Sequence, residues 1–257
     1  MDLMAELAGD LRAETESFEA LLQPLRDEDW ELATPAEGWA IRDQVSHLAW
    51  FDDAAVQAAT DPGGYRAALA GFRSVDDLVV EARRMPPAEL RAWFGAARGR
   101  SLEVFARLGA RDRVPWFGPA MSGASFVTAR LMETWAHGQD VADALGVTRE
   151  PTVRLRHVAT IGFRARPYSF AVRELPEPAE PVRAELAMPD GTRWTAGPAD
   201  AAAVVRGPIL DFCLVVTQRV HLSDTALELT GGPARAWMEI AQAFAGPPGK
   251  GRAPRPG

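Results

Sequence analysis

A carboxylate and an imidazole stand four residues apart in the stretch Arg130-Leu131-Met132-Glu133-Thr134-Trp135-Ala136-His137. Apolar residues recur at helical spacing around it, which predicts a helix over 122–145. On that helix Glu133 and His137 project from one face, within reach of a single ion. The same face is otherwise apolar and carries Phe126, Ala129, Val141 and Ala144. An ionised carboxylate placed there needs a partner, and a metal cation is one candidate.

The spacing alone leaves a second interpretation open. Glu133 has Arg130 one turn before it, and His137 has Asp140 one turn after it, so each can form a local pair along the helix. His47 lies in another stretch of helical spacing, 40–59, among apolar residues. It is either a satisfied core histidine or, if its helix packs beside the first, a third ligand.

The first part of the chain is rich in Ala, Leu, Arg and Glu at helical spacing. Turn signals interrupt it at Asp61-Pro62-Gly63-Gly64 and Met85-Pro86-Pro87. We therefore expect an antiparallel helical bundle followed by one more helix, together forming a first domain over residues 1–173. The expected helices cover 3–25, 40–59, 74–84, 87–108, 122–145 and 152–165.

The proline-rich segment 174–181 cannot continue a helix and is typical of a linker. After it the pattern changes to a smaller domain, 182–246. The expected strands are 182–188, 192–196 and 226–230, and the expected helices are 209–220 and 234–244. Residues 247–257 have few apolar anchors and are predicted to form a disordered tail. The fold class is thus α+β, with an N-terminal four-helix bundle and a smaller C-terminal α+β domain.

The composition is that of a globular protein, with 257 residues, 47% apolar and 25% charged, and a net charge of −7. The negative balance argues against a nucleic-acid partner. No apolar run reaches the length of a membrane span, and the acidic N-terminal segment is unlike a signal peptide. The lone cysteine, Cys213, lies in an apolar run and is interpreted as a small buried hydrophobe. We predict a cytoplasmic protein.

Two separate blocks carry a family resemblance. The first is Thr34-Pro35-Ala36-Glu37-Gly38-Trp39, which leads to Asp43 and His47, and the second is residues 133–146. Together they resemble the mycothiol-dependent maleylpyruvate isomerase family, within the DinB-like group of metal-binding four-helix bundles. The resemblance covers roughly residues 5–150. The C-terminal domain resembles a sterol-carrier-like domain.

The resemblance implies that His47, Glu133 and His137 bind one divalent metal ion. Zinc suits these ligands best, while iron, nickel or manganese are also accepted by imidazole and carboxylate. Asp43 and Asp140 are expected to accept hydrogen bonds from the imidazoles. Arg219 is the expected catalytic and cofactor-binding residue, holding a carboxylate of the thiol or substrate. Its alternative is a solvated arginine at a helix end.

The implied activity is that of a mycothiol-dependent isomerase or S-transferase. It would use mycothiol, or a similar low-molecular-weight thiol, on a small electrophilic metabolite. Two other accounts stay open: a metal-dependent hydrolase or lyase without a thiol, and a non-catalytic protein that binds a metal and a small molecule. A structural ion would have its coordination completed by a fourth protein ligand, whereas a catalytic ion keeps one coordination position open for water or substrate. We expect a monomer or homodimer.

Overall fold

The computed structural model describes residues 2–255 and divides the chain into two units. The first unit extends to Arg149, and the second begins at Glu150. The sequence analysis had placed this division after residue 173. In the structure, the two helices within residues 150–173 belong instead to the same unit as the sheet. Segment 174–181 contains no helix, as its prolines predict.

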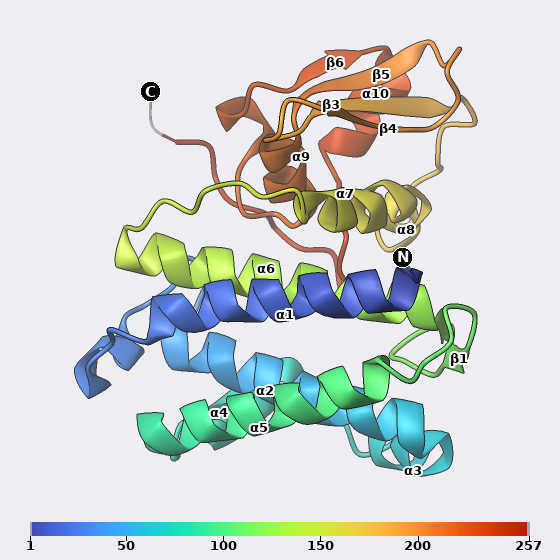
Figure 1. Ribbon diagram of the computed structural model, residues 1–257. Helices are drawn as coiled ribbons and strands as arrows, with labels where there is room; N and C mark the ends of the chain where they lie inside the picture. Colours follow the sequence, from blue (N-terminus) through green and yellow to red (C-terminus); the bar gives the residue numbers. More distant parts are fainter. Residues whose placement is uncertain (1, 256–257) are drawn as a thin grey trace. The chain divides into compact units, whose positions relative to one another are not determined.

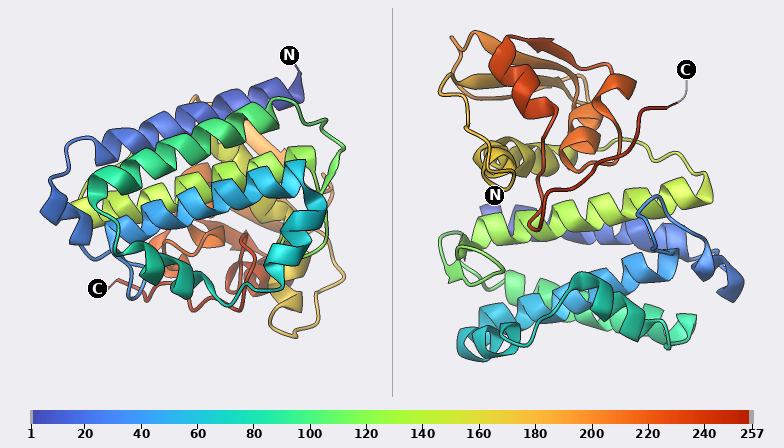
Figure 2. Two further views of the ribbon diagram at one scale, coloured as in Figure 1. Left: turned by 90° about the horizontal axis from the view of Figure 1, so that it is seen from below. Right: turned by 180° about the vertical axis from the view of Figure 1, so that it is seen from behind.

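The first unit is built on four long helices that run side by side (Figures 1 and 2). They are α1 (Leu3–Leu22), α2 (Ile41–Thr60), α5 (Pro87–Phe105) and α6 (Gly123–Leu145). Shorter elements connect them: η1 (Asp27–Glu31), α3 (Pro62–Leu69), α4 (Val75–Ala82), β1 (Arg113–Val114) and β2 (Met121–Ser122). The bundle core includes Phe18, Trp30, Val45, Leu48 and Phe94, none of which is more than 1% exposed. The predicted bundle is therefore present.

Helix α3 stands where the sequence predicted only a turn. The carboxylate of Asp61 accepts a hydrogen bond from the backbone N–H of Gly64, at 2.9 Å, and so caps the helix. Pro62 occupies the first turn, where its missing N–H is not needed. The same residues that indicated a chain reversal therefore begin a helix.

The second unit packs helices against a four-stranded sheet (Figure 1). The strand order is β4-β3-β5-β6, where β5 is parallel to β3 and the other pairs are antiparallel. Its core is centred on Trp237, whose ring packs edge-on against Phe163 and Phe212. The strands are β3 (Val182–Ala187), β4 (Arg193–Ala196), β5 (Ala203–Pro208) and β6 (Glu228–Thr230). The helices are α7 (Leu155–Arg164), α8 (Arg166–Ala171), α9 (Ile209–Val216), η2 (Leu222–Asp224) and α10 (Gly232–Met238).

The central strand β5 was missed by the sequence analysis. It begins in an alanine-rich run, and alanine is depleted in strands, so local preference did not indicate it. The strand forms because Ala203 to Pro208 pair with β3 along its whole length and with β6 on the other side. Helices α9 and α10 also end earlier than predicted.

The C-terminal segment was predicted to be a disordered tail over 247–257. Residues 247–255 contain no helix or strand, but they make contacts within the second unit. The N–H of Gly249 donates to Oε1 of Gln242, and the N–H of Arg255 donates to Asp224. The last two predicted positions, 256–257, lie outside the described residues.

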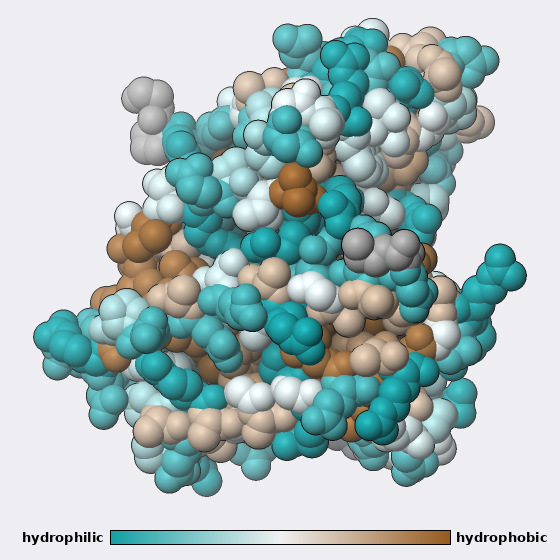
Figure 3. Space-filling model, in the orientation of Figure 1, coloured by the Kyte–Doolittle hydropathy of each residue, from teal (hydrophilic) through white to brown (hydrophobic). Residues whose placement is uncertain are grey.

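Hydrophilic residues cover most of the face shown in Figure 3, with smaller apolar areas between them. The large apolar side chains that are most exposed, Leu3, Val80 and Leu175, come from three different segments. No helix within residues 2–255 is both long and apolar enough to cross a membrane.

Candidate metal centre

Three side chains from two helices of the bundle converge on one point. His47 comes from α2, while Glu133 and His137 come from α6. Oε2 of Glu133 lies 3.4 Å from Nε2 of His47 and 3.1 Å from Nε2 of His137. Each residue offers a ligand atom within 4.8 Å of the ligand atoms of the other two. The spacing of the donors, and their chemistry, fit one divalent cation.

The start of α2 is fixed by Asp43, one turn before His47. Ala40 has no capping side chain, but its N–H donates to the Asp43 carboxylate at 2.9 Å. Arg83 donates to the same carboxylate from Nε at 2.9 Å and from Nη2 at 2.8 Å. The expectation that Asp43 accepts from His47 is therefore wrong. Nδ1 of His47 is buried and has no hydrogen-bond partner among residues 2–255.

The ring nitrogen of His137 that faces away from Glu133, Nδ1, contacts Gln44 on α2. Oε1 of Gln44 lies 2.5 Å from Nδ1 of His137, where the sequence analysis had expected Asp140. Asp140 itself is buried, at 2% exposure. The sequence analysis missed Gln44. Gln44 precedes His47 by three residues and so lies on the same side of α2, which is the one sequence signal that could have indicated it. Only the packing of α2 against α6 makes it a partner of His137.

Burial and charge set the protonation of the cluster. His47 and His137 are each only 8% exposed. Burial, followed by the charge of His137, lowers the pKa of His47 to about 4. Burial by itself would raise the pKa of Glu133, but its hydrogen bonds with His137 and His47 hold the pKa well below its usual value. At neutral pH the cluster therefore presents a carboxylate and a neutral imidazole, the forms that bind metals.

Arg130 is not the partner of Glu133. Its Nε and Nη2 lie 3.2 and 3.0 Å from Oδ1 of Asp52, and Nε of Arg98 lies 2.6 Å from the other oxygen. All three side chains are buried, at 2% exposure or less. Asp52 therefore satisfies the two arginines, and the local Glu133–Arg130 pair that the sequence left open does not form. The sequence analysis missed this network because its members lie on three helices.

Aromatic rings enclose the imidazoles. The ring of Trp39 is nearly parallel to that of His137, at 14° and 6.0 Å, and its centroid is 5.4 Å from that of His47. The ring of Phe51 is 4.5 Å from His47. Nε1 of Trp39 donates to Asp76 at the start of α4, at 3.1 Å, which holds the indole in place. These rings limit the access of water to the cluster.

Arg219 belongs to the second unit, where it follows α9. Its Nη1 donates to the carbonyl of Thr217 at 2.6 Å, and its backbone N–H donates to Leu214. The role expected for its guanidinium stays a prediction. Cys213, in the same helix, is fully buried, and burial raises the pKa of its thiol well above the usual value. The interpretation of Cys213 as a buried hydrophobe is confirmed.

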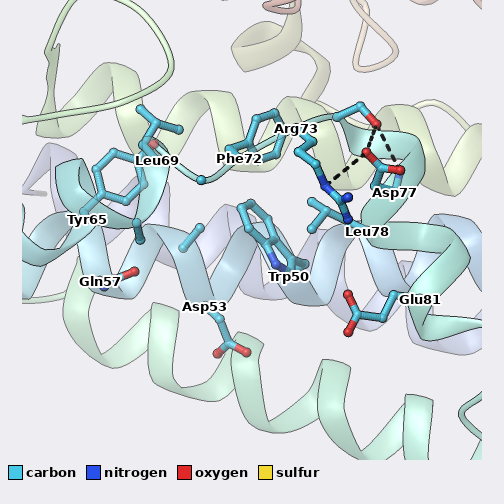
Figure 4. A pocket seen from close by; sticks show the side chains of 14 residues that line it. Trp50, Asp53, Gln57, Tyr65, Leu69, Phe72, Arg73, Asp77, Leu78 and Glu81 are labelled. Atoms are coloured by element: carbon cyan, nitrogen blue, oxygen red, sulfur yellow. Dashed lines mark hydrogen bonds and ion pairs between the residues drawn. The ribbon is translucent and has the colours of Figure 1, made fainter.

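A cavity of about 410 Å³ lies between α2, α3 and α4 (Figure 4). Trp50, Tyr65 and Phe72 supply its aromatic lining, and none of the three cluster residues takes part in it. Two of its acidic groups, Asp53 and Asp77, already have partners. Asp77 pairs with Arg73 at 3.8 Å, and Asp53, which points away from Trp50, accepts from Trp93 and Arg100. Because His47, Glu133 and His137 do not line it, the cavity is separate from the candidate metal centre.

Comparisons with known proteins place this chain among relatives of one enzyme. A family model described as the mycothiol maleylpyruvate isomerase N-terminal domain matches residues 11–142. Uncharacterized proteins from two strains of Mycobacterium tuberculosis are 48% identical over 250 residues, covering 95% of this chain and 96% of their own length.

The fold is also similar to that of solved structures. The crystal structure of the mycothiol-dependent maleylpyruvate isomerase gives a TM-score of 0.61, at 17% identity, and covers 91% of this chain and 98% of that chain. A single-residue mutant of the isomerase gives the same values. At this identity the likeness shows the fold. The family model spans the helices that carry His47, Glu133 and His137, and the chain belongs to the mycothiol maleylpyruvate isomerase N-terminal domain family.

Proposed function

We propose that this protein is a metal-dependent enzyme that uses mycothiol, or a similar small thiol, to isomerise or to substitute a small electrophilic metabolite. Its metal, zinc in the first place and otherwise iron, nickel or manganese, would be held by His47, Glu133 and His137. The observation that carries the proposal is the convergence of Nε2 of both imidazoles on Oε2 of Glu133, at 3.4 and 3.1 Å.

The number of donors favours catalysis over a purely structural ion. The cluster contains three residues, whereas a structural zinc is usually closed by four protein ligands. A three-ligand site leaves a position for water or for a thiol. When bound, the metal would supply positive charge that favours the thiolate form of the thiol.

The nucleophile is proposed to come from outside the chain. Cys213 is buried with a raised pKa, so it is a poor source of thiolate. The family name supports mycothiol as the external thiol. Neutral His47 and ionised Glu133 are ready to ligate without first losing a proton. The rings of Trp39 and Phe51 pack against the His47 imidazole and limit the access of water to it.

The proposed isomerisation needs no oxidant or reductant. The thiolate sulfur forms a bond to one alkene carbon, and the π electrons move onto a conjugated carbonyl. Rotation about the former carbon–carbon double bond, now single, follows. The electrons then return from the carbonyl oxygen to re-form the double bond as the C–S bond breaks and releases the thiolate. In the transferase variant a leaving group departs instead, and the sulfur stays bonded. Arg219 is proposed to hold a carboxylate of the thiol or substrate by charge-assisted hydrogen bonds.

Other parts of the proposal concern the setting of the enzyme. We propose that residues 182–246 resemble a sterol-carrier domain, that the protein works in the cytoplasm, and that it is a monomer or homodimer. The alternatives are a hydrolase or lyase in which the metal activates water, and a protein that binds a metal and a small molecule without catalysis. The three donors, which leave a coordination position open, favour an enzyme over simple binding.

Metal analysis followed by calorimetric titration with mycothiol tests the proposal. The zinc-loaded protein should bind mycothiol, and the metal-free protein should bind it much more weakly. His47→Ala should lose both metal and thiol binding. His221→Ala is the matched control, because His221 lies in the second unit and contacts Ser223. Undiminished thiol affinity after metal removal would contradict the thiolate mechanism and favour the water-activating or binding account.

A further inference from the structure

Gln44 connects the candidate metal centre to the loop that carries Trp39. Its side chain is fully buried. Oε1 of Gln44 lies 2.5 Å from Nδ1 of His137, and Nε2 of Gln44 donates to Oγ1 of Thr34 at 2.8 Å. The hydroxyl of Thr34 in turn donates to the carbonyl of Trp39 at 2.9 Å. The four residues form one chain of hydrogen bonds from a backbone carbonyl to an imidazole.

Only one assignment of donors and acceptors is consistent along these hydrogen bonds. A carbonyl oxygen can only accept, so the single hydroxyl proton of Thr34 is given to Trp39. Oγ1 of Thr34 therefore accepts from Gln44, which must present its NH₂ group to Thr34 and its oxygen to His137. An oxygen at 2.5 Å from Nδ1 requires a proton on that nitrogen. The amide thus determines which ring nitrogen of His137 carries the proton.

We infer that Gln44 is a positioning residue that keeps the proton of His137 on Nδ1 and leaves Nε2 as the ligand atom. This inference rests on the metal site of the proposed function. Nε2 faces Oε2 of Glu133 at 3.1 Å, and a lone pair directed at a carboxylate oxygen is unfavourable unless a proton or a cation lies between them. The arrangement therefore prepares the cluster for a cation before one arrives.

His47 provides the contrast. No described group accepts from, or donates to, its Nδ1. Its ring is held by packing against Trp39, Phe51 and His137 and by the 3.4 Å contact of Nε2 with Oε2 of Glu133. The outer nitrogen of His137 is therefore held by a hydrogen bond, whereas the outer nitrogen of His47 is not. Outer hydrogen bonds of this kind typically change metal affinity by 10- to 100-fold, so the difference is measurable.

The direct test is the protonation of the ring nitrogens in the metal-free protein. Long-range ¹H–¹⁵N spectra distinguish a protonated from an unprotonated imidazole nitrogen, and the chain has 4 histidines to assign. In the wild-type protein Nδ1 of His137 should carry a proton whether or not Nε2 does. Gln44→Met removes the acceptor at similar size, and the signal of His137 should then become a mixture of the two tautomers. Gln44→Glu keeps an acceptor and should restore the Nδ1–H form.

Zinc affinity, measured by competition with a chelator, gives a second readout. We expect a loss of about 10- to 100-fold for Gln44→Met and a smaller loss for Gln44→Glu. Thr34→Val removes the group that orients the Gln44 amide, so its zinc affinity should lie between those of the wild type and Gln44→Met. Unfolding curves for each variant separate lost affinity from lost folding.

The outcomes separate the inference from the proposed function. An unprotonated Nδ1 in the wild-type protein, or an unchanged His137 signal in Gln44→Met, would overturn the role of Gln44 even if zinc binds. Absence of zinc binding with a protonated Nδ1 that depends on Gln44 would overturn the metal proposal and retain the tautomer assignment. If Gln44→Met does not fold, the His137 signals of the wild-type protein and of Thr34→Val still test the role of Gln44.

Discussion

Nε2 of His47 on α2 lies 3.4 Å from Oε2 of Glu133 on α6, although 86 positions separate the two residues in the sequence. Glu133 also contacts His137, and within residues 2–255 neither His47 nor Glu133 has a further ion-pair partner. The contact brings a neutral imidazole and a carboxylate together inside the bundle. The proposed ligand set therefore depends on the packing of two helices.

Replacing Glu133 by Gln should nearly abolish metal binding, because the change removes the only negative charge among the three donors. We expect zinc affinity to fall by more than about 100-fold, beyond the usual range for outer partners. Equilibrium dialysis with metal analysis measures the change. Glu103→Gln, on the exposed side of α5, is the control and should bind zinc as the wild type does. Equal affinity in the two variants would contradict the assignment of Glu133.

The metal-free protein should lose stability as the pH falls from about 6.5 to about 4. The pKa of His47 is about 4 in the folded chain and near 6.5 when unfolded, so in this window the unfolded chain binds a proton that the folded chain does not. The loss has an upper bound of about 3 kcal/mol. The lowered pKa of Glu133 acts in the same direction below about pH 4.5. Urea unfolding across this range measures the slope, which should be smaller in His47→Gln.

Asp52→Ala should destabilise the bundle by about 3–5 kcal/mol, because it leaves the buried guanidinium groups of Arg98 and Arg130 without their carboxylate. Its neighbour Asp53 is the matched control. Asp53 pairs with a half-exposed Arg100, so Asp53→Ala should cost about 1 kcal/mol. Denaturant unfolding gives the free energy of unfolding of both variants. Similar losses of stability in the two would argue against the buried network as a structural element.

Trp39→Ala should speed the release of zinc to a chelator several-fold, because the indole covers both imidazoles. Trp39→Phe keeps an aromatic ring and should release zinc more slowly than Trp39→Ala. Asp76→Ala removes the acceptor of the indole N–H and should fall between wild type and Trp39→Ala. Stopped-flow measurement of zinc release compares the variants, and identical rates in all of them would remove Trp39 from the enclosure of the site.

Arg219→Ala should bind zinc normally but bind mycothiol more weakly, because its proposed role is recognition of a carboxylate and not coordination. Arg219→Lys keeps the charge without the two-pronged geometry, and should recover part of the affinity. Calorimetry on the zinc-loaded variants gives both values. Loss of zinc from Arg219→Ala would show that the residue acts on the bundle instead.

The sequence by itself predicted the α+β class, the bundle and the shared helix face of two of the three candidate ligands. Local information suffices there, because Glu133 and His137 are held on one face by the helix that contains both. Gly146, with a positive φ of 64°, ends that helix at the predicted residue. The family resemblance added His47, whose own helix gave no sign of its partner.

Only the tertiary structure decided which groups serve the cluster from outside. Asp43 was one turn from His47, yet Arg83 and the start of α2 engage it, and Gln44 contacts His137 instead. The strand β5 likewise depends on partners on both sides and not on its alanines. A helix fixes neighbours three or four residues apart, whereas contacts between elements depend on how their faces pack, which no local pattern encodes.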